Sequence, residues 1–194
     1  MFIRAAASRK RRKISDRFQG PYDGGRLFVV GIILVDMATV AFANSFFGRL
    51  AFQYWPGMAS VFGGLLLAII IIRLGRPKLY FDWIIVGILH LWLGLILTND
   101  PLLASTWSLA SFYVILAASA ALTTWIGVTI GILGDGGTWL VAGGLASFVC
   151  AVVGGIINGW TDFSIEPDVI LGTNLLLLGL AIGGLGLSLR KTLK

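Results

Sequence analysis

The sequence is poor in the residues that water-soluble enzymes rely on. Charged residues make up only 12% of its 194 residues and hydrophobic residues 57%, whereas a soluble domain carries about 25% charged residues. Cysteine and histidine occur once each. The low charge and the long apolar runs place the chain among membrane proteins.

The single cysteine and the single histidine exclude two kinds of site. Cys150 cannot form an internal disulfide, and Cys150 with His90 cannot supply the ligand set of a zinc ion. A lone thiol in an apolar run packs as a small hydrophobic side chain. The sequence also shows no nucleophile–base constellation, no phosphate-binding loop and no paired carboxylates in one span. We therefore expect a protein without catalytic residues, cofactor or metal.

Six apolar runs predict an all-α membrane protein with six transmembrane helices. A bilayer core about 30 Å thick requires roughly 20 apolar residues per helix, and open strands cannot cross it because their backbone groups would lack partners. The predicted spans are 27–47, 54–73, 80–98, 103–126, 138–158 and 168–188. We divide the chain into a basic arm (1–25), a transmembrane domain (26–190) and a tail (191–194).

Basic residues collect on one side of these spans. Of the 15 Lys and Arg residues, all but Arg49 lie on the side that holds both termini. Because cytoplasmic segments of membrane proteins are enriched in Lys and Arg, we expect both termini in the cytoplasm. Five or seven spans would scatter this pattern.

The N-terminal arm contains the densest run of charge, "SRKRRK" (8–13). It could contact anionic lipid headgroups, at about 1 kcal/mol per residue, or an acidic surface of another subunit; nucleic acid would bind only non-specifically. The alternative is a topology signal with no further role. The residues concerned are Arg9, Lys10, Arg11, Arg12 and Lys13.

Similar segments recur along the chain at a constant interval. "LFVVGIILVDMATV" (27–40), "WIIVGILHLWLG" (83–94) and "WLVAGGLASFVC" (139–150) place glycines at positions 31, 87 and 143, which are 56 residues apart. These segments predict three repeated helical hairpins at about 27–73, 80–126 and 138–188. Small residues allow transmembrane helices to approach closely, so we expect helix packing at Gly31, Gly87 and Gly143.

The return helix of each predicted hairpin carries small residues seven positions apart. Seven residues are two helical turns, so each pair lies on one helix face. The pairs are Gly57 with Gly64, Ser111 with Ala118, and Gly172 with Gly179. Glycines at the same depth in three hairpins then predict three helix pairs that dock by one geometry.

The hairpin "WIIVGILHLWLGLILTNDPLLA" resembles the repeat of the HdeD-type acid-resistance membrane proteins. "VILGTNLLLLGLAIGGL" (169–185) is similar to their return helix, and the resemblance extends over about residues 26 to 190. It is weakest in the first hairpin, where "SFFGRLAFQYWPG" replaces a short proline turn. The resemblance implies six spans, a bacterial inner-membrane location and a link to acid stress, and it supplies no catalytic residues.

Asp36 and His90 are the ionisable residues deepest in the predicted spans. Their depths differ by only about 3 Å if the repeats align, at 1.5 Å per residue. They are therefore a candidate intramembrane polar pair, able to sense or relay protons, provided that spans 1 and 3 are neighbours. The alternatives are local hydrogen bonds for each residue, or His90 as an axial ligand of a haem or chlorophyll.

These observations leave three functions open. The first is a non-enzymatic, stress-related inner-membrane protein of HdeD type. The second is an accessory or structural subunit of a larger membrane complex, respiratory or photosynthetic, that uses its apolar helix faces and basic arm as contacts. The third is a small transporter.

Overall fold

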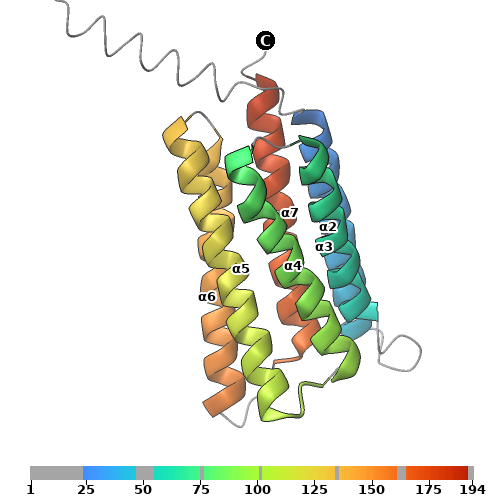
Figure 1. Cartoon of the computed structure of the whole chain (residues 1–194). Coiled ribbons are helices and arrows are strands. Elements are labelled where there is room, and N and C mark those ends of the chain that lie inside the picture. The colour runs from blue at the N-terminus through green and yellow to red at the C-terminus, as the bar shows by residue number, and fades with distance from the viewer. Residues whose placement is uncertain are drawn as a thin grey trace, which may run out of the picture.

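The computed structural model describes residues 24–46, 55–74, 77–100, 102–133, 136–160 and 165–191, and all of its regular structure there is helical. The helices form a single upright bundle (Figure 1). They are α2 (Gly24–Phe46), α3 (Trp55–Leu74), α4 (Pro77–Asn99), α5 (Thr106–Leu133), α6 (Gly137–Trp160) and α7 (Pro167–Lys191). Residues 1–23 of the predicted basic arm and the last three residues of the tail lie outside the described residues.

Proline, aspartate and glycine set the ends of several helices. Pro77 and Pro167 are the first residues of α4 and α7, where a missing backbone N–H is not needed for intrahelical bonding. The Asp100 carboxylate accepts hydrogen bonds from the backbone N–H groups of Ala104 and Ser105, at 3.0 Å each, and so closes the turn into α5. Gly136 adopts φ 108° just before α6, a conformation that favours glycine.

Five of the six helices are long and apolar enough to cross a membrane, which makes the chain a multi-pass membrane protein. The exception is α3, whose described apolar stretch, Gly57–Ile69, is shorter. Of the six predicted spans, five are thus long and apolar enough to cross a membrane, and the sixth, α3, is apolar over a shorter described stretch.

Consecutive helices run in opposite directions, so that α2 begins and α7 ends at the same end of the bundle (Figure 1). The closest packing, however, joins α2 with α7, α3 with α4, and α5 with α6. The predicted hairpins pair α2 with α3, α4 with α5, and α6 with α7, which are the looser contacts. The bundle thus contains three tight helix pairs, and each of them joins helices of two different predicted hairpins.

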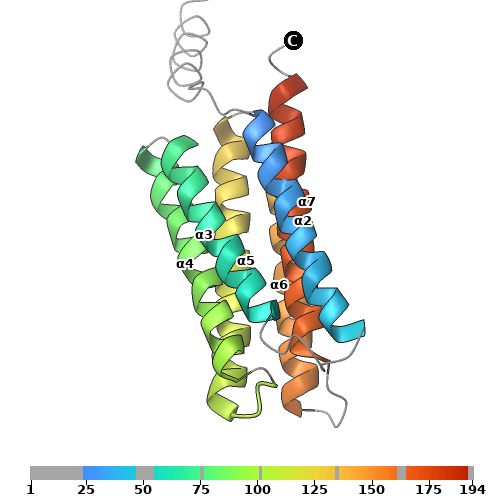
Figure 2. The ribbon, with the colours of Figure 1, turned by 90° about the vertical axis from the view of Figure 1, so that its right-hand side faces the viewer.

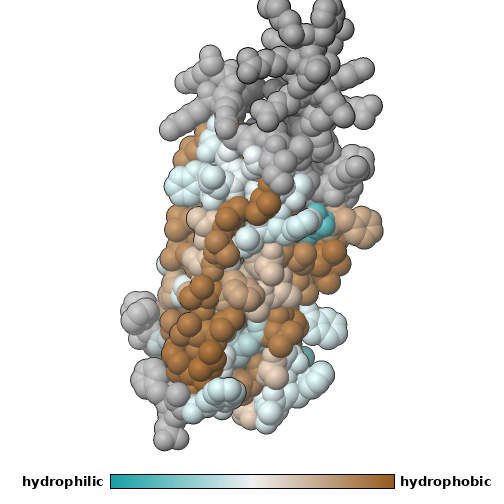
Figure 3. All heavy atoms as spheres, turned by 90° about the vertical axis from the view of Figure 1, so that its left-hand side faces the viewer, coloured by the Kyte–Doolittle hydropathy of each residue, from teal (hydrophilic) through white to brown (hydrophobic). Residues whose placement is uncertain are grey.

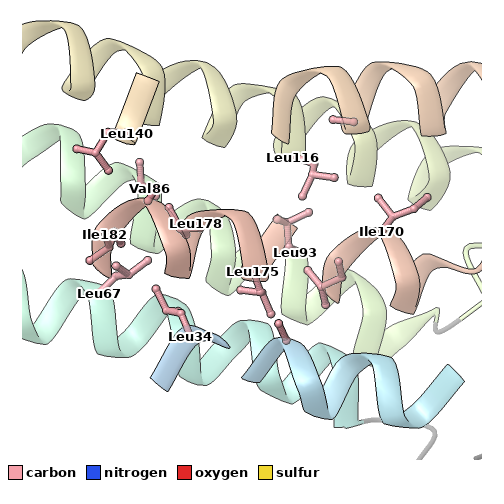
Figure 4. Packing of buried hydrophobic residues seen from close by; sticks show 14 of the residues in the cluster. Leu34, Leu67, Val86, Leu93, Leu116, Leu140, Ile170, Leu175, Leu178 and Ile182 are labelled. Carbon is pink, nitrogen blue, oxygen red and sulfur yellow. The ribbon is translucent and has the colours of Figure 1, made fainter. Parts of the chain in front are cut away.

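Helix α7 occupies the middle of the bundle. Buried residues make up 72% of its apolar span, against 28–39% in the other four spans. Figure 4 shows Leu175, Leu178 and Ile182 of α7 among leucines of the surrounding helices, including Leu34 and Leu67. Because lipid is as apolar as these side chains, the contacts stabilise the bundle mainly through close packing and dispersion.

The outer surface of the bundle carries large apolar side chains. Over α6 these include Leu145, Phe148, Val149, Val152 and Ile156, all at least 40% exposed. Figure 3 shows apolar residues covering much of one face. Exposed side chains of this kind suit contact with lipid tails.

Candidate functional site

The structure does not bring the predicted pair together. Asp36 lies on the exposed side of α2, whereas His90 of α4 is completely buried. Helices α2 and α4 are not among the closely packed pairs. The hypothesis of a proton relay between Asp36 and His90 is therefore corrected: similar depth placed the two residues at one level, but they face different surroundings.

His90 lies at the centre of a polar cluster built from four helices. Its Nδ1 is 2.9 Å from the Val86 carbonyl oxygen of its own helix, and its Nε2 is 3.4 Å from Asn174 Oδ1 of α7. The Ser119 hydroxyl of α5 lies 3.4 Å from Nδ1. Ser60 of α3 donates a hydrogen bond of 2.8 Å to the His90 backbone carbonyl.

The close carbonyl of Val86 determines the tautomer of His90. A carbonyl oxygen only accepts, so Nδ1 must carry a proton and donate to it. In the neutral ring Nε2 is then an acceptor. The Asn174 amide can donate an N–H to Nε2 if its side chain is flipped by 180°, which exchanges the positions of Oδ1 and Nδ2. With Asn174 Oδ1 toward the ring, Nε2 must carry a proton as well, and the ring is a cation.

The surroundings of His90 favour the neutral ring. The groups that face it from α3, α5 and α7 are Ser60, Ser119 and Asn174, none of which carries charge. A buried cation without a counter-charge costs several kcal/mol, of order 3–5 when one partner is missing. The local hydrogen-bonding interpretation of His90 thus agrees with the structure, and the cluster ties α3, α4, α5 and α7 together.

The described residues contain no group of three or more His, Cys, Asp or Glu side chains that could hold a metal ion. Cys150 is half-buried on α6. Of the two nitrogens with which His90 could bind a haem or chlorophyll, Nδ1 is hydrogen-bonded to the Val86 carbonyl oxygen. The other, Nε2, faces Asn174 inside the bundle.

Four of the predicted packing glycines lie in close backbone contacts, two between α2 and α7 and two between α3 and α4. A Cβ atom on Gly31 would lie 2.6 Å from the Gly179 carbonyl oxygen, and one on Gly179 would lie 2.8 Å from that of Gly31. On α3 and α4, a Cβ on Gly87 would lie 2.9 Å from the Gly64 carbonyl oxygen. Such distances allow no side chain, so only glycine permits these helices to be this close.

The remaining predicted packing glycines are placed in different ways. Gly57 meets the backbone of Gly94 on α4, at 2.8 Å for an added Cβ, and Gly172 meets the ring of Phe42 at 3.2 Å. Gly143 faces Ala181 of α7 and not α5. The next residue, Gly144, makes the contact with α5, so the third repeat is shifted by one position relative to the first two.

The seven-residue spacing extends further than the sequence analysis recognised. On α5 the contact with α6 runs through Ala120 and Gly127, whereas the predicted Ala118 is exposed and Ser111 is only half-buried. The spacing was the right signal, but in a run rich in Ala, Ser and Gly it fits more than one face. The burial pattern of the folded helix is needed to choose between them.

A second polar cluster, which the sequence analysis missed, joins the ends of α5, α6 and α7. Asn158 Nδ2 donates to the Tyr113 hydroxyl and to the Ile165 carbonyl oxygen, at 2.8 Å each, and its Oδ1 accepts from the Ile165 N–H at 2.7 Å. Asn158 therefore holds the connection between α6 and α7 in place. Its position in an otherwise apolar helix end was the available signal.

The predicted lipid or partner contacts of the basic arm, residues 9–13, lie outside the described residues. Comparison of the sequence and the structure with protein-family models, with curated proteins and with solved structures finds no match in any of the three. The resemblance to HdeD-type proteins accordingly stays a prediction.

Proposed function

We propose that the protein is a non-enzymatic accessory subunit that works by binding another membrane protein through the outer surface of its helices. The observation that carries this proposal is the exposed carboxylate of Asp36 on an otherwise apolar helix surface. Asp36 is the thirteenth of the 23 residues of α2, so it lies near the helix midpoint.

A carboxylate in this position requires a partner. An ionised Asp at the centre of a transmembrane helix costs about 2.5–3.5 kcal/mol on insertion scales. Within the described part of the chain, Asp36 forms no hydrogen bond or ion pair. The bundle itself therefore does not offset this cost, and a second membrane protein over α2 would.

The distribution of Lys and Arg residues along the chain supports one orientation of the bundle in the membrane. We infer six crossings with both termini in the cytoplasm, in a bacterial inner membrane, because all basic residues but Arg49 then lie on one side. The alternating direction of the helices supports this inference, since an even number of crossings returns the chain to its starting side (Figure 1).

Site-specific photo-crosslinking in intact membranes tests the proposal. A photoreactive amino acid is introduced at one exposed position on each of four helices: Ile32, Phe62, Val114 and Val149, which are 46–67% exposed. The proposal expects at least one position to give an adduct of a single mass with a membrane protein that also purifies with the chain in fixed stoichiometry. Lipid adducts alone at all four positions would contradict it.

A second candidate function is a role in acid stress, which the HdeD resemblance implies. The observation that favours it is His90, the only imidazole of the chain, which is buried among uncharged groups and whose protonation state determines which atom of the Asn174 amide can bond to its Nε2. Under this proposal His90→Gln lowers survival at acid pH at unchanged protein abundance, measured by immunoblot. Equal survival of the variant and the wild type would exclude it.

A further inference from the structure

We infer that the partner over α2 is a transmembrane helix that carries a Lys or Arg side chain near the middle of the bilayer. This inference rests on the proposed function and names the chemistry of the partner. Helix α2 packs against α7 and α3 (Figure 2). The basis of the inference is the arrangement of residues on its opposite, outer face.

The outer face of α2 presents an apolar stripe with one carboxylate at its middle. Val29 and Ile32 are 53% and 46% exposed, and Asp36 and Thr39 are exposed as well. Their spacing of three, four and three residues puts them on one side of the helix. A second helix packed along this stripe would cover Asp36 and remove it from lipid.

The neighbouring hydroxyl does not satisfy the carboxylate. The Thr39 hydroxyl donates its proton to the Val35 carbonyl oxygen, at 3.0 Å. A hydroxyl has one proton to donate, so this one is not available to Asp36. The donor must therefore come from outside the bundle.

A second copy of the chain does not offer a cation at the required depth. In the five candidate spans the only Lys or Arg is Arg26, ten residues before Asp36 on the same helix and so about 15 Å away along the axis. In a second copy inserted in the same orientation, Arg26 lies at the same depth as Arg26 of the first copy, and therefore about 15 Å from the depth of Asp36. A symmetric pair through this face would place Asp36 against Asp36, and like charges repel.

A basic residue on a different protein meets the requirement. Lys or Arg at mid-depth is as unfavourable in lipid as Asp, so each group gains by meeting the other, and intramembrane ionisable residues characteristically pair in this way. The apolar residues on either side of Asp36 would contact the rest of the partner helix. Charge complementarity thus selects the partner, and the stripe orients it.

The test uses the full chain in vesicles of phosphatidylcholine and phosphatidylglycerol at 3:1, with a donor fluorophore at its C-terminus. Synthetic 22-residue Leu/Ala helices with an acceptor fluorophore carry Lys, Leu or Asp at their centre. Energy transfer is measured against peptide density. We expect the Lys helix to bind at least tenfold more tightly than the Leu helix.

Three variants give the result its meaning. Asp36→Asn should abolish the preference for the Lys helix, and Asp36→Lys should transfer it to the Asp helix. Asp82→Asn, which removes a half-buried carboxylate of α4, is the matched control and should keep the preference. Because Asp36 is exposed, the variants should fold, and circular dichroism checks this.

Equal binding of the Lys and Leu helices to the wild type would overturn the inference, as would a preference that survives Asp36→Asn. Self-association that Asp36→Asn abolishes, without preference for Lys, would overturn it in favour of a second copy. If crosslinking identifies a partner subunit but the Lys helix binds no more tightly than the Leu helix, the inference is refuted and the proposed function is not. Lipid adducts at all four crosslinking positions would instead refute the proposed function.

Discussion

The seam between α2 and α7 offers the sharpest test of how this bundle holds together. In Gly31→Ala, the new Cβ would lie 2.6 Å from the Gly179 carbonyl oxygen and from Cα of Gly183. All of these neighbouring atoms belong to backbone, so no side chain can rotate away. Ordinary contact begins at 3.4 Å, and the helices must therefore separate by about 1 Å.

The size of the effect follows from two opposing contributions. Overpacking of a close interface costs about 1–3 kcal/mol. Alanine also favours a helix over glycine by roughly 0.5–1 kcal/mol. Gly159→Ala on α6 is the matched control, because nothing lies within 4 Å of its added Cβ. The helix preference is common to both variants, so their free energies of unfolding should differ by about 1–3 kcal/mol.

Unfolding in mixed micelles of dodecyl maltoside and dodecyl sulfate, followed by circular dichroism, measures this difference. We expect Gly31→Ala to unfold at a lower dodecyl sulfate fraction than Gly159→Ala. If Gly31→Ala is as stable as the control, or more stable, then α2 and α7 do not approach each other as described, and the small-residue account of the bundle is refuted.

Three further predictions concern the polar residues. Asn158→Ala should lower the free energy of unfolding by about 1–3 kcal/mol, because Tyr113 and the backbone at residue 165 lose their partner; unchanged micelle unfolding would contradict this. Asn174→Leu should cost roughly 0.6–1 kcal/mol, with coupling to His90→Phe in a double-mutant cycle; additive effects would show that the two side chains do not interact. The Ser105 N–H, ahead of the other hydrogen bonds, lowers the pKa of Asp100. The ionised Asp100 carboxylate should thus stabilise the turn before α5 at pH values above the pKa of Asp100 in the unfolded chain. This stabilisation should be lost as the pH falls through the lower pKa that Asp100 has in the folded protein. Hydrogen exchange at Ala104 and Ser105 should accelerate, relative to the pH-corrected intrinsic rate, only in that acid range, and Asp100→Asn should abolish the acid step; a step retained in this variant would refute the assignment.

The helices were predictable from the sequence, but their pairing was not. Long apolar runs can only be helices in lipid, and the predicted spans overlap all six observed helices. Partner choice depends on which small residues face which neighbour. Glycine or alanine marks every tight seam, so α2 could have paired with several helices, and its pairing with α7, the last in the chain, became visible only in the folded bundle.

The separation of Asp36 from His90 has a physical reason that the sequence already contained. Apolarity cannot distinguish the inner face of a membrane helix from the lipid-facing one, since both are apolar, but small residues can. A helix turns about 100° per residue. His90, three residues after Gly87, therefore lies within about 60° of that glycine, whereas Asp36, five residues after Gly31, lies about 140° from its own.

The glycines at positions 31 and 87 both face a neighbouring helix, so these angles assign His90 to the interior and Asp36 to the surface, as the structure has them. Depth along the helix and angle around it are independent coordinates, and a contact requires both. The same reasoning applies to the proposed partner: its basic residue must match Asp36 in depth and must also lie on the side of its helix that faces α2. A peptide with Lys at the correct depth but flanked by bulky residues on that face should therefore bind less tightly than one flanked by alanine.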